Sequence, residues 1–213
     1  MKILIVAMTA SVHTARWINQ ISAETGVEVH LFPAFPADPT MELRNVTLHG
    51  LAFFRPVGLD KSVRYKGYLP IFKSINYFEN RFCRLFPNLW AGLLGYTIRR
   101  IKPDIVHSLE FQHSSAFVLP VITKIRKTAK KIPKWIATNW GSDIYLFGRL
   151  NNSREKVVEI LENCDFYSCE CKRDVILAEK MGLRGQSLPV MPNAGGFDLE
   201  YLSTLGQKIV PSE

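Results

Sequence analysis

Short apolar runs alternate with amphipathic stretches along the first fifty residues. Residues 2–8 form the first run, and a segment with helical spacing then begins near Ser11 and ends near Gly26. Residues 27–32 alternate apolar and polar side chains as a strand does, and residues 46–51 are a third, weaker strand candidate. A strand, a helix and a further strand in this order are typical of a βαβ unit, so this part of the chain predicts a parallel sheet covered by helices.

The second half of the chain repeats this pattern, and glycine and proline residues mark the ends of its elements more clearly. It predicts strands at residues 103–107, 134–138, 165–169 and 187–191, and helices at residues 114–131 and 172–181. We therefore expect an α/β fold, a Rossmann-like, doubly wound parallel sheet of about seven strands in a single domain.

The stretch from Lys61 to Arg84 combines basic and aromatic residues, mostly three or four positions apart. This spacing predicts a basic amphipathic helix. Such a helix can simply cover the sheet, with Lys and Arg stems lying over apolar neighbours. It can also rest on an anionic membrane surface, where basic residues beside Phe and Tyr are the expected chemistry. Nucleic-acid binding has no recognition motif to accompany the charge, so we expect no nucleic-acid partner.

The composition is that of a folded globular protein. With 47% hydrophobic and 22% charged residues among 213, the sequence is unlike disordered, collagen-like or coiled-coil chains. The 27 Lys and Arg residues exceed the 19 Asp and Glu residues, which gives a net charge of +8. This excess favours an acidic partner such as a phosphate-bearing ligand or an anionic membrane surface.

The cysteines and the N-terminus point to a cytoplasmic chain. Cys83, Cys164, Cys169 and Cys171 are too few for a disulfide scaffold, and the last two lack the two-residue gap of a zinc knuckle. We therefore expect reduced thiols and no metal. The apolar run at residues 3–8 is far shorter than the roughly 20 residues of a membrane helix, so it predicts a buried strand and not a signal peptide.

Polar residues follow four of the predicted strands, and in an open parallel sheet ligands bind beyond the carboxyl ends of the strands. A helix that begins after the first strand would bind an anion through its free N–H groups. The candidates are Thr9, Ser11, His13, Thr14 and Arg16 after the first strand, Ser108, Glu110, Gln112 and His113 after the fourth, Asn139, Gly141, Ser142 and Asp143 after the fifth, and Asn193 after the last.

Missing motifs argue against three enzyme classes, which are nicotinamide oxidoreductases, P-loop ATPases and α/β-hydrolases. The sequence has no Gly-x-Gly-x-x-Gly fingerprint, no phosphate-binding P-loop and no Gly-x-Ser-x-Gly elbow.

Two of the polar residues have a structural role as an alternative to a functional one. His107, at a strand end, is typical of a hydrogen-bonded core histidine, and Asp143 can cap the helix that follows it.

Six segments together resemble the N-terminal domain of a family 4-type glycosyltransferase with the GT-B fold, and the resemblance runs nearly end to end. They are Met-Lys-Ile-Leu-Ile-Val at the start, Ser11-Val-His13-Thr-Ala-Arg16-Trp17, Lys102-Pro-Asp-Ile-Val-His107, Trp140-Gly-Ser-Asp143, Lys172-Arg-Asp174 and Pro192-Asn-Ala-Gly-Gly-Phe-Asp198.

The resemblance implies a retaining glycosyl transfer in which a C-terminal domain holds a nucleotide sugar and the N-terminal domain binds the acceptor. It implies no cofactor and no obligatory metal, since the nucleotide sugar is a co-substrate. It assigns residues 1–197 to the N-terminal domain and residues 198–213 to the start of a hinge toward a donor-binding domain, in cis or on a partner subunit. Without a held donor, the domain by itself is expected to bind but hardly catalyse.

The resemblance also suggests roles for the polar residues. It places Asp143 and His13 at the catalytic centre. It places Ser11, Arg16 and Asn193 near the donor phosphates, and Glu110, Gln112, His113, Asn139, Gly141 and Ser142 on the acceptor side.

Two classes of function stay open. The first is the acceptor-binding half of a glycosyltransferase acting on a glycan, polysaccharide or lipid-linked acceptor in cell-envelope glycan synthesis. That protein would be cytoplasmic, with possible peripheral contact of the stretch from Lys61 to Arg84 with the inner membrane face. The second is a non-catalytic α/β module that binds an anionic small molecule or a protein through the same crevice.

Overall fold

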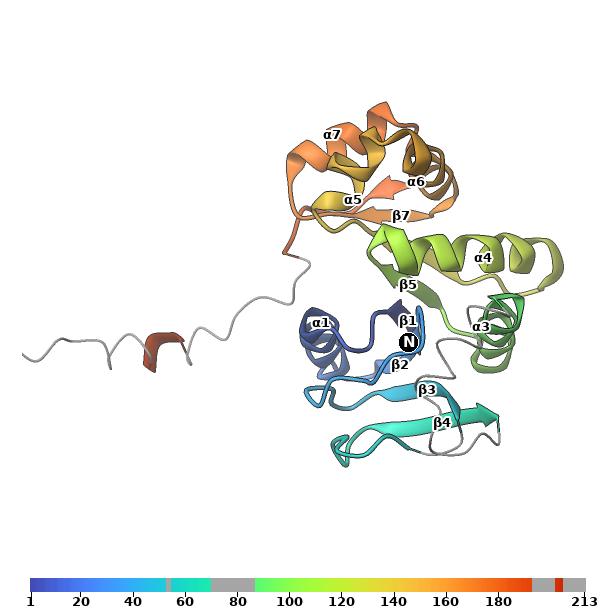
Figure 1. Cartoon of the computed structure of the whole chain (residues 1–213), viewed down its shortest axis with the longest axis vertical. Coiled ribbons are helices and arrows are strands. Elements are labelled where there is room, and N and C mark those ends of the chain that lie inside the picture. The colour runs from blue at the N-terminus through green and yellow to red at the C-terminus, as the bar shows by residue number, and fades with distance from the viewer. Residues whose placement is uncertain (53–54, 70–86, 193–201, 205–213) are drawn as a thin grey trace, which may run out of the picture.

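A computed structural model describes residues 1–52, 55–69, 87–192 and 202–204 of the chain. Its centre is one eight-stranded sheet in the order β4-β3-β2-β1-β5-β6-β7-β8, in which all neighbouring strands are parallel (Figure 1). This confirms the predicted Rossmann-like α/β sheet. The strands are β1 (Lys2–Ala7), β2 (Glu28–Pro33), β3 (Thr47–Ala52), β4 (Arg64–Leu69), β5 (Ile105–Leu109), β6 (Lys134–Thr138), β7 (Phe166–Ser168) and β8 (Gln186–Ser187).

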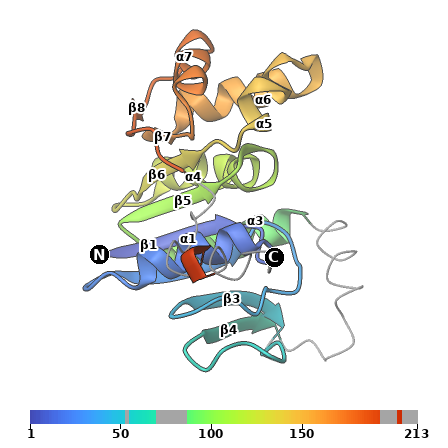
Figure 2. The same ribbon diagram turned by 90° about the vertical axis from the view of Figure 1, so that its left-hand side faces the viewer.

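Helices cover both faces of the sheet, as a doubly wound fold requires. Helix α1 lies on one face, and α3, α4 and α6 lie on the other (Figures 1 and 2). The helical elements are α1 (Val12–Ser22), α3 (Pro87–Ile101), the π-helical turn η1 (Phe111–Ser115), α4 (Ala116–Thr128), α5 (Ser142–Tyr145), the 3-10 turn η2 (Phe147–Arg149), α6 (Asn151–Asn163) and α7 (Lys172–Lys180).

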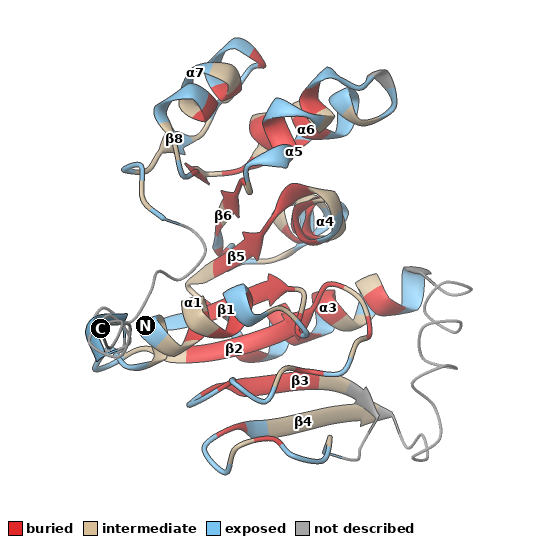
Figure 3. Ribbon diagram, turned by 60° about the vertical axis from the view of Figure 1, so that its left-hand side comes forward, coloured by how far each residue is buried: buried red, intermediate tan, exposed pale blue. Residues whose placement is uncertain are grey.

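The central strands are buried on both faces, which explains why they read as near-continuous apolar runs (Figure 3). In β1, Leu4 and Val6 belong to the core under α3 and α4, whereas Ile3 and Ile5 belong to the core under α1. Successive side chains of a strand point to opposite faces, so one strand contributes to both cores.

The prediction of one amphipathic helix from Lys61 to Arg84 is wrong for its described part. Arg64–Leu69 form strand β4, which pairs with β3. Tyr65 packs against the core under α1 and Tyr68 against the core under α3, so the two tyrosines point to opposite faces as strand residues do. Pairing with the open edge of β3 overrides the local helical spacing. Residues 70–84 of that stretch lie outside the described residues.

Two further predicted elements differ in length. In place of a last strand at residues 187–191, β8 ends at Ser187, although the N–H of Leu188 still donates to the carbonyl of Tyr167 at 2.8 Å. The helix predicted at residues 114–131 is η1 followed by α4. The hinge predicted at residues 198–213 lies largely outside the described residues.

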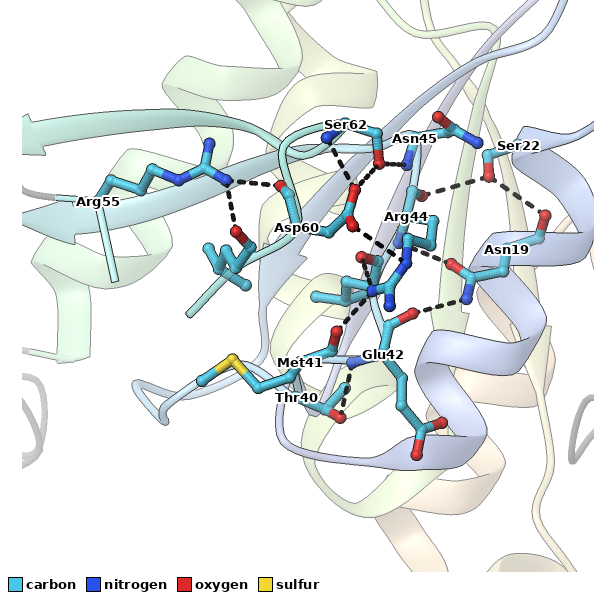
Figure 4. A network of polar contacts seen from close by, with 12 residues as sticks. Asn19, Ser22, Thr40, Met41, Glu42, Arg44, Asn45, Arg55, Asp60 and Ser62 are labelled. Atoms are coloured by element: carbon cyan, nitrogen blue, oxygen red, sulfur yellow. Dashed lines mark hydrogen bonds and ion pairs between the residues drawn. The ribbon is translucent and has the colours of Figure 1, made fainter. Parts of the chain in front are cut away.

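A polar network ties the connections before β3 and β4 to helix α1 (Figure 4). The side-chain amide of Asn19 donates to the carbonyl of Glu42 and accepts from the N–H of Arg44, both at 2.8 Å. Arg44 forms an ion pair with Asp60 at 3.4 Å, and Ser62 also donates to that carboxylate. These contacts hold irregular segments against the helix, together with the buried side chains of Leu43, Leu59 and Val63 in the core under α1.

None of the helices in the described part of the chain combines the length and apolar character that a membrane crossing requires.

Candidate functional site

The sheet winds outward from β1 in two directions. The chain runs through β2, β3 and β4 on one side of β1, then crosses back to β5 on the other side and continues to β8 (Figures 1 and 2). The carboxyl ends of β1 and β5 therefore mark the topological switch point, where open α/β sheets bind ligands. We call the loops that follow β1, β5 and β6 there, residues 8–14, 110–115 and 139–143, the switch-point edge.

Helix α1 begins at this edge with an open N-terminus. Its first turn contains no acidic residue, and the side chain of the N-cap residue Ser11 makes no capping hydrogen bond. The hydroxyl of Thr14, in the same turn, is buried without a hydrogen-bond partner among the described residues. The free N–H groups and the helix dipole favour a negatively charged ligand at this position.

His13 and Trp140 connect the loop after β1 with the loop after β6. Their rings meet edge to face with centroids 6.2 Å apart, and His13 is exposed. The indole N–H of Trp140 is buried and has no partner within the described part of the chain. Arg16, one turn further along α1, is half-buried.

Glu110 directly follows β5 in a strained backbone conformation. Its φ is 72°, and a residue other than glycine adopts such a conformation at a cost of about 1–3 kcal/mol. Its buried carboxylate accepts hydrogen bonds from the N–H groups of His113 at 2.9 Å and Ser114 at 2.5 Å, which caps η1. Strain of this kind, held by a buried polar side chain, is common at functional sites.

The carboxylate of Asp143 joins the loop after β6 to the loop after β5. It is 2% exposed and accepts hydrogen bonds from the N–H of Trp140 at 2.8 Å and the N–H of Phe111 at 2.9 Å. Burial raises the pKa of Asp143 to about 7, against the lowering effect of these two hydrogen bonds; the nearby charge of Glu110 also raises it. Asp143 is thus a buried carboxyl group whose pKa lies near neutral pH.

Asn139 joins the loop after β6 to helix α7. Its side chain is fully buried, donates to the Asp174 carboxylate at 2.9 Å and accepts from the N–H of Ile144 at 3.1 Å. Asp174 is also fully buried and accepts from Arg173 at 2.8 Å. This pair fixes the loop that carries Gly141 and Ser142, both of which are exposed.

The structure therefore brings together most of the residues that the sequence analysis selected. Asp143 lies near Glu110 and Gln112, and His113 contacts the Glu110 carboxylate at 3.4 Å. The ring of His113 is exposed and meets Phe35 edge to face at 5.4 Å. Glu110, Asn139 and Asp143 direct their polar atoms into the protein. The hydroxyls of the predicted residues Thr9, Thr14 and Ser108 are buried as well. Asn193 lies outside the described residues.

His107 is the hydrogen-bonded core histidine that the sequence predicted. Its Nε2 lies 2.6 Å from the Thr138 hydroxyl, and its ring meets Trp17 edge to face at 5.9 Å. Burial lowers its pKa to about 4, so the ring is neutral at ordinary pH.

Asp174 stands out in the sequence only as part of a motif, with no role attached to it. An acidic residue in the first turn of a helix is usually an exposed partner of the helix dipole. Its burial depends on Asn139, which is 35 residues away in the chain. No local pattern reports such a contact.

Among the described residues, no three His, Cys, Asp or Glu side chains are placed to hold a metal ion. Cys164, Cys169 and Cys171 are free thiols.

No protein-family model and no curated protein sequence matches the chain. Solved structures of similar fold include two of sucrose-phosphate synthase from Thermosynechococcus elongatus. One has a TM-score of 0.51 at 14% identity, and the match covers 99% of this chain and all of that one. The other has a TM-score of 0.54 at 13% identity, and the match covers 99% of this chain and 53% of that one.

A third structure is UDP-GlcNAc 2-epimerase from Neisseria meningitidis bound to UDP-GlcNAc, with a TM-score of 0.54 at 12% identity. The match covers 98% of this chain and 51% of that one. The chain thus spans about half the length of the longer proteins that it matches. At such low identity the likeness shows the fold, which is the Rossmann-like α/β fold of GT-B proteins, a glycosyltransferase-like fold.

Proposed function

We propose that the chain is the acceptor-binding, N-terminal half of a retaining glycosyltransferase of the family 4 type, which transfers a sugar from a nucleotide sugar to a glycan, polysaccharide or lipid-linked acceptor. The observation that carries this proposal is the convergence of Glu110, Gln112, His113 and Asp143 at the switch-point edge of a glycosyltransferase-like fold. In the transfer, the bond from the sugar to the diphosphate breaks and a bond to the acceptor oxygen forms. The donor is held by a second domain, in cis or on a partner subunit.

The N-terminus of α1 is the proposed contact for the departing diphosphate. Its uncapped first turn and the exposed ring of His13 offer N–H donors to a group that gains negative charge during the transfer. Ser11 and Arg16 flank this position, and Asn193 is proposed as a further contact. No cofactor is required by this scheme, because the charge is met by the chain's own donors.

The acceptor contacts divide into two kinds. Gly141, Ser142 and His113 are exposed and accessible to a ligand. Glu110 and Asn139 are buried and use their polar atoms on backbone groups and on Asp174, so we propose that they position the loops. The geometry of Asp143 supports the same positioning role, because its carboxylate is held by two backbone N–H groups.

The second candidate function, a non-catalytic module that binds an anionic ligand, draws on the same geometry. The two carboxylates predicted at the site, Glu110 and Asp143, are 4% and 2% exposed and are engaged inside the protein. A carboxylate that acts as a general base must reach the proton that it removes. A binding module needs only the open end of α1 and the exposed side chains around it.

Contact with the inner face of a membrane is a separate part of the proposal. Its basis is an amphipathic helix from Lys61 to Arg84, and the described part of that stretch is strand β4. Flotation of the protein with anionic vesicles at low salt tests it directly. Absence of binding at low salt would remove the membrane from the proposal.

The first experiment is the intact mass of the native gene product in its source cells. A full enzyme requires a second domain, on the order of 150 to 200 further residues, whereas this chain has a mass of 24.3 kDa. The native product is then assayed with a panel of nucleotide sugars for release of the nucleotide diphosphate. Release that falls at least tenfold in His13→Ala but not in the exposed control Glu24→Ala supports the proposal. Binding of anions without turnover of any nucleotide sugar supports the binding module instead.

A further inference from the structure

A row of polar side chains crosses the sheet on the face that α3 covers. The Glu28 carboxylate, at the start of β2, lies 3.0 Å from Nε2 of His30, and Nδ1 of His30 lies 3.0 Å from Nε2 of His49 in β3. Nδ1 of His49 lies 2.6 Å from the Tyr68 hydroxyl in β4, and that hydroxyl lies 2.7 Å from the Thr97 hydroxyl in α3. Both rings and Thr97 are buried. We call these five residues the histidine chain.

With both rings neutral, the histidine chain holds fewer hydrogens than it has polar contacts. Its four internal contacts are followed by a fifth, from the Thr97 hydroxyl to the carbonyl of Leu93 at 2.8 Å. Each neutral imidazole and each hydroxyl contributes one hydrogen, which makes four. The carboxylate and the carbonyl at the two ends only accept, so they contribute none. Four hydrogens for five contacts leave one contact without a hydrogen.

One added proton fills every contact, and the two ends of the chain fix where it goes. From the carbonyl end, Thr97 donates to the carbonyl, Tyr68 donates to Thr97, and Nδ1 of His49 donates to Tyr68. From the carboxylate end, Nε2 of His30 donates to the carboxylate. The fifth hydrogen then lies between Nδ1 of His30 and Nε2 of His49, where both rings hold it. Without it, the hydroxyl hydrogens of Tyr68 and Thr97 can turn back toward His49, so proton uptake reverses both hydroxyls.

The charged and titratable groups around the two rings come from four elements. They are Lys2 of β1, Glu28 of β2, Lys66 and Tyr68 of β4, and Tyr96 and Arg100 of α3. Burial raises the pKa of Glu28, but its contacts with His30 and with Lys2 at 3.4 Å outweigh this effect and lower it, so the carboxylate is ionised. Among these described groups Glu28 is the only anion, so it is the counter-ion for a proton on the rings.

Burial lowers the pKa of both rings and keeps them uncharged near neutral pH. For His49 the positive charges of His30, Lys66 and Arg100 add to the effect of burial, and its pKa is lowered to about 3. The contribution of His30 arises only when both rings are charged. A single proton shared by the rings avoids this repulsion and lies next to Glu28, so we expect the first proton to bind at a higher pH than about 3.

We propose that His30 and His49 form a proton-binding site, with one proton shared between Nδ1 of His30 and Nε2 of His49. The site is a pH-sensitive device that goes beyond the proposed sugar transfer and does not depend on it. In acid solution the shared proton completes an unbroken row of hydrogen bonds from β2 through β3 and β4 to α3.

Nitrogen-15 NMR of the histidine rings in the full-length protein tests the site, because the chemical shift of each ring nitrogen reports whether that atom carries a hydrogen. The spectra are followed from about pH 8 down to the acid unfolding of the protein. We expect His30 and His49 to titrate together, in one step that adds one proton to the two rings. Two independent steps, or rings that both stay neutral until the protein unfolds, would overturn the proposal.

Substitution of Thr97 tests whether the far end of the histidine chain sets the proton affinity. Thr97→Val removes the acceptor that the Tyr68 hydroxyl needs when the protonated ring donates to Tyr68. We expect the shared pKa to fall by about one pH unit, a tenfold loss of proton affinity, and to stay at the wild-type value in Thr97→Ser. Thr123→Val is the matched control, because Thr123 donates to the carbonyl of Leu119 in α4 at the same 2.8 Å but lies outside the histidine chain.

A purely structural role predicts the opposite sign for Tyr68→Phe. If the Tyr68 hydroxyl only donates to Nδ1 of His49, it holds that ring neutral, and its loss raises the pKa of the ring. In the proposed site the charged ring donates to this hydroxyl, and a hydrogen bond from a charged group is the stronger one, so its loss lowers the pKa. A pKa that is raised in Tyr68→Phe or unchanged in Thr97→Val therefore overturns the proposal.

The two variants also guard against loss of the fold. Thr97→Val keeps the shape of the side chain, so it gives an answer even if Tyr68→Phe does not fold. Thermal unfolding at neutral pH shows which variants are folded. Because these readouts need no sugar transfer, their outcome leaves the proposed function untouched.

Discussion

The Asp143 carboxylate accepts a hydrogen bond from the backbone N–H of Phe111 at 2.9 Å, across 32 residues of sequence. Asp143→Ala leaves this N–H and that of Trp140 without their acceptor, at a cost of about 1–3 kcal/mol for each group that stays buried. If the proposed function holds, we expect turnover of the full-length protein to fall at least tenfold, roughly 1.4 kcal/mol of barrier, because the two loops are no longer held in place relative to each other. Steady-state kinetics with thermal unfolding as a parallel readout measures both effects.

Asp143→Asn separates a positioning role from acid–base chemistry. The amide oxygen of asparagine can accept both hydrogen bonds, but the side chain cannot exchange a proton near neutral pH. If Asp143 positions the loops, turnover of the asparagine variant stays within about twofold of wild type. A loss as large as that of the alanine variant would make Asp143 an acid or a base in the reaction.

The titration of Asp143 should make the free energy of unfolding depend on pH, in a direction that follows from its raised pKa. The pKa of Asp143 is raised to about 7 in the folded protein, against about 3.9 in an unfolded chain. Between these values the folded state binds more protons, so this group's contribution to the free energy of unfolding is fully present below about pH 3.9 and is lost as the pH rises through about 7. The free energy of unfolding of Asp143→Asn, compared with wild type in urea at several pH values, isolates this contribution. A difference that is flat between about pH 4 and pH 7.5 would contradict the raised pKa.

The titration of His107 should change the free energy of unfolding with pH in the opposite direction. Burial lowers its pKa to about 4, whereas an unfolded histidine titrates near about 6.5. The stabilisation from keeping the ring neutral is present above about pH 6.5 and is lost as the pH falls toward about 4. We expect His107→Gln to reduce, and not to abolish, the decline in stability over this range. Part of the decline persists because the pKa of the buried His49 is also lowered, to about 3.

Much of the fold could be predicted because buried parallel strands have a strong local pattern. The sequence predicts a strand at residues 134–138, and β6 has these bounds. Strand β4 could not be predicted in this way, since Arg64, Tyr65 and Tyr68 have a spacing that also fits a helix. Only the free edge of β3 decides between the two.

The candidate site shows the same division between local and non-local information. The order of the elements predicts which loops meet at the switch-point edge, but not which way their side chains point. Glu110 and Asp143 are ordinary loop carboxylates in the sequence, yet both face inward to backbone N–H groups. Arg149 and Arg173, 24 residues apart, meet only through the ring of Tyr145.

Asn19 is expected to be a main support of the segment before β3 (Figure 4). Its amide pairs with the carbonyl of Glu42 and the N–H of Arg44 much as a neighbouring strand would. Asn19→Ala removes both hydrogen bonds and should lower the free energy of unfolding by about 1–2 kcal/mol. Asn19→Asp keeps the acceptor for Arg44 but places a carboxylate oxygen against the carbonyl oxygen of Glu42, so a loss at least as large is expected. The exposed Glu24, just beyond α1, provides the control Glu24→Gln.

Two glycines should respond to alanine in opposite directions. A Cβ atom on Gly185 would lie 2.5 Å from the backbone oxygen of Cys164, so the edge of the sheet beside β7 and β8 must move to accept it. Such overpacking costs typically about 1–3 kcal/mol, and here the atom that must move belongs to the backbone. Gly92, within α3, is exposed and a Cβ atom there would meet no other atom within 4 Å, so alanine should stabilise the helix by about 0.5–1 kcal/mol. Urea unfolding of both variants measures the two changes, and a Gly185→Ala protein as stable as wild type would show that the β7–β8 edge is more adaptable than its close packing implies.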